Sequence, residues 1–86
     1  MPTERLRETL QELRAELARS DAGDAETRES VQATALEIDA WLERPEPPEE
    51  SWSDRLRIGV ARFEKEHPRL AATLQRVVDA LSDLGI

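Results

Sequence analysis

The sequence lacks cysteine altogether and holds only one histidine, three glycines and three aromatic residues. Without cysteine there is no disulfide, no thiolate metal ligand and no thiol nucleophile. The scattered glycines form no phosphate-binding loop. No serine stands in a nucleophile-elbow pattern, so a Ser-His-Asp arrangement has no support beyond composition. We therefore expect no enzyme activity, no catalytic residues and no cofactor.

Long apolar runs are missing as well. No run approaches the roughly 20 residues that a helix needs to cross a bilayer. The start, residues 1–5, passes directly into charged residues without the apolar stretch of a signal peptide. These absences favour a cytoplasmic protein that has no membrane partner.

Negative charge is abundant and unevenly distributed. The net charge is −7. Residues 1–43 hold eleven acidic residues against five arginines, a net of −6, and residues 44–50 add −2, whereas residues 51–86 carry a net of +1. The acidic first half argues against nucleic-acid binding, which needs a basic face. The contrast between the halves would also attract one copy to another.

Apolar residues recur at alternating intervals of four and three, which is the spacing of one face of an α-helix. Thr34 and Trp41 widen the second of four such stripes. The stripes are Leu6, Leu10, Leu13 and Leu17; Val31, Ala35, Ile38 and Leu42; Trp52, Leu56, Val60 and Phe63; and Leu70, Leu74, Val77, Leu81 and Leu84. The spacing predicts an all-α protein of about four amphipathic helices.

Capping and turn residues suggest where these helices begin and end. Thr3 is the expected N-cap of the first helix, which should end near Ser20 in a cluster of turn formers. Asp24 is the expected cap of the second helix, and Ser51 or Ser53 that of the third. Each short connection makes its two helices antiparallel neighbours.

The ends of the fourth helix carry their own signals. Pro68 favours a helix start and keeps the preceding residue out of the helical region, although one kinked helix remains an alternative. Gly85 stands where a C-terminal cap belongs.

A proline-rich segment separates the two halves. Residues 44–50 contain three prolines in four positions, which forbids helix and favours an extended chain. We interpret residues 1–86 as a single helical domain, with an acidic hairpin over 1–43, a connector over 44–50 and two helices over 51–86. Trp41 and Trp52 flank the connector. Packing at this junction is the favoured interpretation, and an aromatic clamp for a peptide or ligand is the alternative.

Several apolar residues lie off the main stripes, among them Leu36 and Ile58. Together with the small core and the coiled-coil-like heptad spacing of the last helix, they favour a homo-oligomeric bundle. Ala71 and Ile86 widen that last seam. The candidate self-association residues are Leu70, Leu74, Val77, Val78, Leu81 and Leu84.

Two other functions have some basis in the residues. Arg55, Arg57, Arg62 and Arg69 would form the basic strip of a small regulatory or nucleic-acid-associated protein. A carboxylate metal site is the less favoured alternative. Its sources would be a ladder of four glutamates at positions 4, 8, 12 and 16 or the pair Glu64 and His67.

Two blocks near the end of the chain resemble a known family. The first runs Phe63-Glu64-Lys65-Glu66-His67-Pro68-Arg69-Leu70-Ala71, and the second runs from Val77-Val78-Asp79-Ala80-Leu81 to Gly85-Ile86. With the opening Leu6-Arg7-Glu8-Thr9-Leu10, they are similar to a bacterial family of short proteins, domain-of-unknown-function family 4404. The resemblance implies a stand-alone helical domain and supplies no activity or site residues. From the residues themselves we expect a non-enzymatic, self-associating protein–protein interaction module with an unidentified protein partner.

Overall fold

The computed structural model describes residues 2–19, 25–44 and 46–86. They form four helices, namely α1 (Pro2–Arg19), α2 (Ala25–Glu43), α3 (Ser51–Phe63) and α4 (Pro68–Asp83), and these described parts contain no strand. The all-α prediction is confirmed. The break at Pro68 separates two helices and does not kink a single one.

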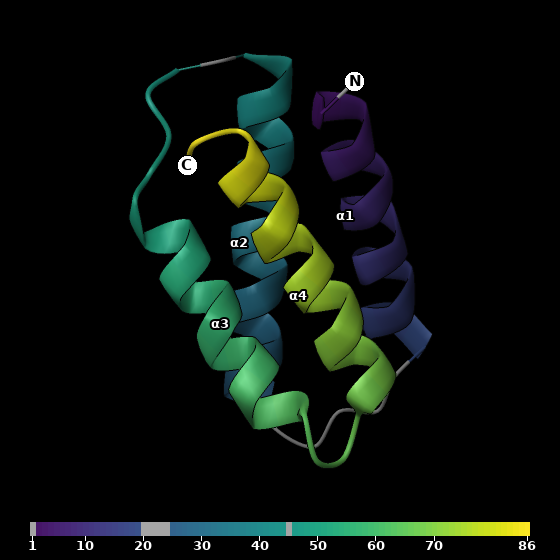
Figure 1. Ribbon diagram of the computed structural model, residues 1–86. Helices are drawn as coiled ribbons and strands as arrows, with labels where there is room; N and C mark the ends of the chain where they lie inside the picture. Colours follow the sequence, from purple (N-terminus) through teal and green to yellow (C-terminus); the bar gives the residue numbers. More distant parts are fainter. Residues whose placement is uncertain (1, 20–24, 45) are drawn as a thin grey trace.

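The helices run alternately up and down in a four-cornered bundle (Figure 1). Helix α1 packs against α2 and α4, and α3 packs against the same two helices, so that α1 and α3 lie at opposite corners. The start of α1 and the ends of α2 and α4 lie at one end of the bundle. The opposite end carries the turn between α3 and α4, beside the end of α1.

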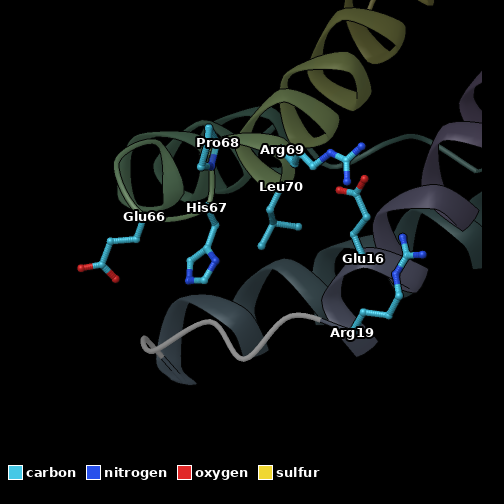
Figure 2. Close-up of a pocket in the computed structure, with 7 residues that line it drawn as sticks. All are labelled: Glu16, Arg19, Glu66, His67, Pro68, Arg69 and Leu70. Atoms are coloured by element: carbon cyan, nitrogen blue, oxygen red, sulfur yellow. The ribbon is translucent and has the colours of Figure 1, made fainter.

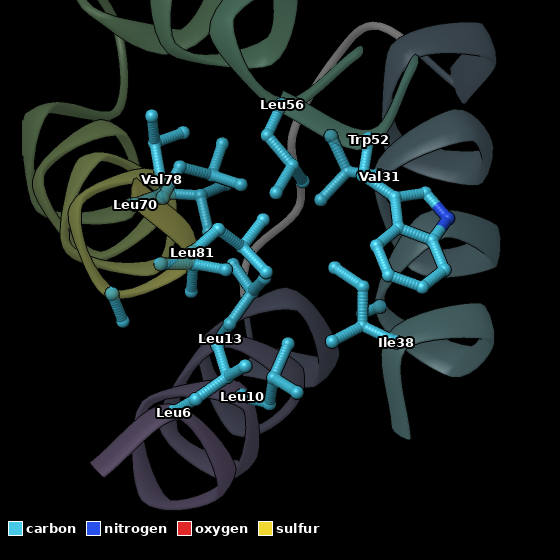
Figure 3. Close-up of a cluster of buried hydrophobic side chains, with 14 of the residues drawn as sticks. Leu6, Leu10, Leu13, Val31, Ile38, Trp52, Leu56, Leu70, Val78 and Leu81 are labelled. Carbon is cyan, nitrogen blue, oxygen red and sulfur yellow. The ribbon is translucent and has the colours of Figure 1, made fainter. Parts of the chain in front are cut away.

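The predicted stripes meet in one core, part of which Figure 3 shows. All four leucines of the α1 stripe are between 0% and 3% exposed. Leu42, Val60 and Leu84 are half-buried and pack against this core. We call the buried leucines of α1 and α4 the leucine core: Leu6, Leu10, Leu13, Leu17, Leu70, Leu74 and Leu81.

Buried threonines interrupt the apolar core without leaving polar atoms unpaired. The hydroxyls of Thr9, Thr34 and Thr73 donate to backbone carbonyls four residues earlier, over 2.7 Å, 2.8 Å and 3.1 Å. Such bonds to the preceding turn satisfy a hydroxyl inside its own helix. The threonines therefore add volume to the core without the cost of an unsatisfied polar group.

Gly59 allows three helices to approach closely. A Cβ atom at this position would lie 2.8 Å from Cγ2 of Val31 on α2 and 3.2 Å from Cδ1 of Leu74 on α4. Glycine destabilises a helix interior by about 1 kcal/mol relative to alanine. Its presence in α3 is explained by this close packing.

Two of the predicted helix starts are wrong by a few residues. Helix α1 begins at Pro2, so Thr3 lies inside the first turn and does not cap it; proline suits that first position because its fixed φ is helical. The N-cap of α3 is Glu50, which makes no side-chain capping bond. Ser51 and Ser53 lie within that helix. The predicted cap Asp24 lies outside the described residues.

The ends of α4 agree with their sequence signals. His67 has φ −134° and ψ 65°, which ends the helical backbone just before Pro68. Gly85 has a φ of +81°, a left-handed conformation that suits glycine. The N–H groups of Gly85 and Ile86 donate to the carbonyls of Ser82 and Leu81, which completes a Schellman-type cap.

The residues predicted for self-association lie inside this single chain. Leu70, Leu74, Val77, Val78 and Leu81 are at most 3% exposed, and Leu84 is half-buried. Ala71 is buried as well. The α4 seam faces the chain's own helices, and any contact between copies through these residues would require the bundle to open. Self-association itself stays a prediction.

Candidate functional site

A hollow lies at the end of the bundle that carries the turn between α3 and α4 (Figure 2). We call it the loop-end hollow. It measures about 500 Å³, and its lining comes from the last turns of α1 and the first residues of α4. The lining residues are Glu16, Arg19, Glu66, His67, Pro68, Arg69 and Leu70.

His67, the only histidine, serves the fold at this hollow. Its backbone N–H donates to the carbonyl of Phe63 over 2.7 Å, and its carbonyl accepts from Ala71 over 3.0 Å. Its ring stands edge-on to that of Phe63, with centroids 6.2 Å apart. These contacts join the end of α3 to the start of α4. His67 therefore has a structural role in the turn.

The charges of the loop-end hollow are mixed in sign. Two carboxylates, Glu16 and Glu66, share it with the guanidinium groups of Arg19 and Arg69. The carboxylate of Glu16 already accepts a hydrogen bond from the hydroxyl of Thr73 over 2.8 Å. A lining of two acids and two bases favours neither an anion nor a cation. The hollow therefore offers no selective chemistry for a charged ligand.

The two metal hypotheses receive no support from the side-chain positions. In the described parts of the chain, no three His, Asp or Glu side chains come together in a group that could hold a metal ion. In the glutamate ladder of α1, Glu12 pairs with Arg76 over 2.8 Å and Glu16 accepts from Thr73, so both carboxylates are bound to side chains of α4. Glu64 and His67 are joined by no third ligand.

The four arginines predicted as a basic strip are not brought together. Arg55 pairs with Glu37 over 2.8 Å and with Glu49 over 2.9 Å, so its charge is locally balanced. Arg57 follows two residues later on α3 and therefore lies about 200° around the helix from Arg55. Arg69 belongs to α4, at the loop-end hollow. Arg55 and Arg57 therefore lie on different faces of α3, and Arg62 is exposed in the last turn of the same helix.

A second hollow lies where α2, the proline-rich segment and α3 meet. It measures about 350 Å³. We call it the tryptophan hollow, because both tryptophans line it. Its lining residues are Glu37, Ala40, Trp41, Arg44, Glu46, Pro47, Glu49 and Trp52.

The two tryptophans contact each other across the junction, as the packing interpretation predicted. Their ring centroids are 5.8 Å apart with an angle of 69° between the planes, the edge-to-face arrangement that aromatic rings prefer. The indole N–H of Trp41 donates to the backbone carbonyl of Glu46. Trp41 therefore holds the segment after α2 against the bundle.

Arg55 forms the second attachment of this segment. One guanidinium nitrogen contacts Glu37 on α2, and the other contacts Glu49 and Ser51, each over 2.8–2.9 Å. The first nitrogen also lies 3.4 Å from the buried hydroxyl of Thr34. Arg55 thus joins α2, the segment before α3, and α3 itself beside the tryptophan hollow.

Trp52 differs from Trp41 in its polar atom. Its side chain is almost fully buried, with 3% exposed, and its Nε1–H has no hydrogen-bond partner among the residues that the structure describes. Figure 3 shows this nitrogen on the side of the ring that faces away from the labelled aliphatic side chains. A buried donor without an acceptor costs about 1–3 kcal/mol. Native structures contain few such groups, and each calls for an explanation.

One comparison with known proteins gives a match. The model of the family described as "Domain of unknown function (DUF4404)" matches residues 6–86. The chain belongs to this family. The resemblance seen in the sequence is thereby confirmed, and the family description supplies no activity. Neither the curated proteins nor the solved structures contain a match to the chain.

The sequence alone predicted only some features of the tryptophan hollow. It placed both tryptophans beside the proline-rich segment, but it held no sign that only one indole would find an acceptor. It also did not predict the role of Arg55, because its acceptors Thr34, Glu37 and Glu49 lie 6–21 positions away. A search for arginines facing acidic residues across a predicted junction would have found that network.

None of the helices in residues 2–19, 25–44 and 46–86 is long and apolar enough to cross a membrane.

Proposed function

We propose that the protein is a non-enzymatic protein–protein interaction module that also associates with itself. One observation carries the proposal. The apolar stripes of the helices are buried in the core, whereas α1 and α2 carry exposed carboxylates that form no ion pair with the described residues. Glu4, Glu8, Glu26 and Glu29 are exposed and form no ion pair with the described residues. Glu4 and Glu8 lie toward the end of the bundle where α1 begins, and Glu26 and Glu29 toward the opposite end, where α2 begins. We call Glu4 and Glu8 the acidic face.

The distribution of arginines strengthens this argument. Arg5, Arg7 and Arg14 of α1 pair with acids on neighbouring helices, at 3.8 Å, 3.8 Å and 2.9 Å, and therefore do not neutralise the acidic face. A surface of one charge sign attracts a partner of the opposite sign and steers its approach. The partner of the acidic face would be a protein with a basic surface.

Two exposed aliphatic side chains support self-association. Ile58 on α3 is 55% exposed and Leu36 on α2 is 47% exposed, and they are the large hydrophobic residues that the bundle leaves in solvent. Single exposed apolar residues are common in monomers, so these two support the proposal only together with the contrast in charge between the halves of the chain.

Affinity capture tests the partner half of the proposal. Wild-type protein should retain a basic partner from a lysate of the native organism at low salt. A variant with Glu4→Gln and Glu8→Gln should lose it, as should wild-type protein at high salt. An Arg57→Gln variant is the matched control, since it alters an exposed charge elsewhere. Retention of the same proteins by wild type, by the double variant and by the Arg57→Gln variant would refute the acidic face.

Sedimentation tests the self-association half. Wild-type protein at high micromolar concentration should sediment above the mass of one 9.8 kDa chain. An Ile58→Glu variant should sediment as a monomer, and an Ala61→Glu variant at another exposed position of α3 should not differ from wild type. A wild-type monomer at this concentration would contradict self-association.

A further inference from the structure

We infer that the tryptophan hollow binds an extended, proline-containing and positively charged segment of a partner protein. The inference deepens the proposed function, because it rests on the partner being a protein, and it assigns a second surface and a chemical class of ligand. It stands on the unpartnered Nε1–H of Trp52, the occupied Nε1–H of Trp41 and the charges around the hollow.

The unpartnered indole indicates what the ligand must supply. An N–H donor needs an acceptor oxygen or nitrogen, which excludes a purely apolar ligand and a bare cation as sufficient occupants. The side chain is more than nine-tenths buried, so bulk water does not fill this role. A peptide carbonyl is a neutral acceptor and brings an apolar body that can pack on the rings.

The protein's own proline-rich segment shows how such a ligand is held. The carbonyl of Glu46, the residue before Pro47, accepts the N–H of Trp41, and Pro47 lines the same hollow. Proline-rich chains are already extended and lose little entropy on binding, and aromatic grooves recognise them in this way. Trp52 offers a second donor of the same kind, beside the first, without a carbonyl to accept it.

Charge decides which proline-containing segment fits. Three carboxylates line the hollow, and the two arginines beside them, Arg44 and Arg55, leave one negative charge uncompensated; Arg55 pairs with both Glu37 and Glu49. Glu46 is left, with the exposed Glu50 nearby in the chain. A second copy of this chain would bring its own acidic segment against these carboxylates. Repulsion therefore disfavours the second copy and favours a partner that carries lysine or arginine.

Binding is coupled to a movement of the segment that covers the hollow. The Nε1 atom of Trp52 is itself buried, so an incoming carbonyl reaches it only when its surroundings open, and we infer that the segment 46–50, which contributes Glu46, Pro47 and Glu49 to the lining, moves aside. All five of these residues are exposed. The movement breaks the bond between Trp41 and Glu46. The ligand then replaces this bond and adds the one that Trp52 lacks.

Nuclear magnetic resonance of ¹⁵N-labelled full-length protein tests the inference. The chain has two indole N–H signals, which a Trp41→Phe variant assigns. The probe is the synthetic peptide Lys-Pro-Pro-Arg-Pro-Pro-Lys. It should shift both indole signals saturably, move the Trp52 proton downfield and slow its exchange with solvent. Two control peptides, with Glu for every basic residue or Gly for every proline, should bind more weakly.

Two protein variants separate this inference from the proposed function. Glu46→Gln removes a charge of the hollow and should weaken peptide binding about two- to fivefold, the effect expected of one exposed ion pair. Glu8→Gln on α1 is the matched control and should leave peptide binding unchanged while reducing capture through the acidic face. Trp52→Phe should weaken peptide binding, read from the indole signal of Trp41, and Glu46→Gln keeps the test decisive if that variant does not fold.

Four results would overturn the inference: indole signals that do not move with the basic peptide, equal binding of the glycine peptide, equal binding of the acidic peptide, or a Trp52 signal that shifts with protein concentration alone. The last result would assign the hollow to a second copy of the chain. None of these outcomes affects capture of a partner by Glu4 and Glu8, so affinity capture tests the proposed function independently of this inference.

Discussion

The leucine core and the tryptophan hollow are built on opposite principles. In the leucine core, apolar side chains from α1 and α4 are buried together, and the neighbouring threonines donate to their own helices. In the tryptophan hollow, an indole donor lacks an acceptor and the covering segment is exposed. A region that stabilises the fold has its apolar side chains packed and its polar groups hydrogen-bonded, whereas a region that recognises a partner keeps groups that can still form contacts. We therefore place stability in the first and binding in the second.

The largest expected effect comes from a charge in the leucine core. Leu74→Asp places an unpaired carboxylate at a site that is 0% exposed. Burial of an unpaired charge is far more costly than the 2–5 kcal/mol, roughly, of a leucine-to-alanine change, so cooperative folding should be lost. Far-UV circular dichroism during a urea titration measures this. Ala72→Asp, at an exposed position two residues earlier, should unfold much as wild type does. A cooperatively folded Leu74→Asp protein would remove α4 from the core.

Gly59→Ala should destabilise the bundle by a smaller amount. The added methyl group would meet Val31, whose β-branched side chain is stiff, at 2.8 Å. Overpacking costs about 1–3 kcal/mol, and alanine regains about 1 kcal/mol of helix propensity, which leaves a net loss of up to about 2 kcal/mol.

A double-mutant cycle checks the cause of this loss. Adding Val31→Ala makes room for the new methyl group, so the double variant should be more stable than the sum of the single urea-unfolding changes predicts. Additive changes would show that the cost of Gly59→Ala does not arise from its contact with Val31.

The smallest effect concerns the edge of the tryptophan hollow. Arg55→Met removes the contacts to Glu37, Glu49 and Ser51 and should cost about 1 kcal/mol, because the side chain is only partly exposed and two ion pairs are lost. The cost should fall as salt increases. Arg57→Met, at an exposed position on the same helix, should change the free energy of unfolding in urea by less than about 0.5 kcal/mol. Equal effects of the two variants would mean that Arg55 does not hold the segment before α3.

The sequence predicted the helices of this fold better than it predicted which helices pack against one another. The spacing of Leu6, Leu10, Leu13 and Leu17 identifies α1, since burial on one side of a helix demands that period. The same period does not say which helix covers the stripe. Heptad spacing in α4 is compatible with a partner in another chain or in the same chain, and the structure buries it in the same chain.

The features that the sequence did not predict depend on contacts between distant residues. Gly59 carries no periodic signal, and its role appears only when α2 and α4 approach it. The lack of an acceptor for the buried Nε1 of Trp52 likewise depends on the three-dimensional surroundings of that atom. Capping preferences failed at Thr3 because Pro2 begins the helix one residue earlier. They failed at Ser51 because its hydroxyl accepts from Arg55.

Helicity of the isolated monomer tests most directly whether the leucine core lies within one chain. Protein diluted until sedimentation shows a single 9.8 kDa species should keep its far-UV helical signal and unfold cooperatively in urea. This outcome is expected whether or not copies associate at higher concentration, because the four stripes are covered by the chain's own helices. A monomer that has lost its helicity would contradict the account and show that the stripes of α1 and α4 are buried between chains.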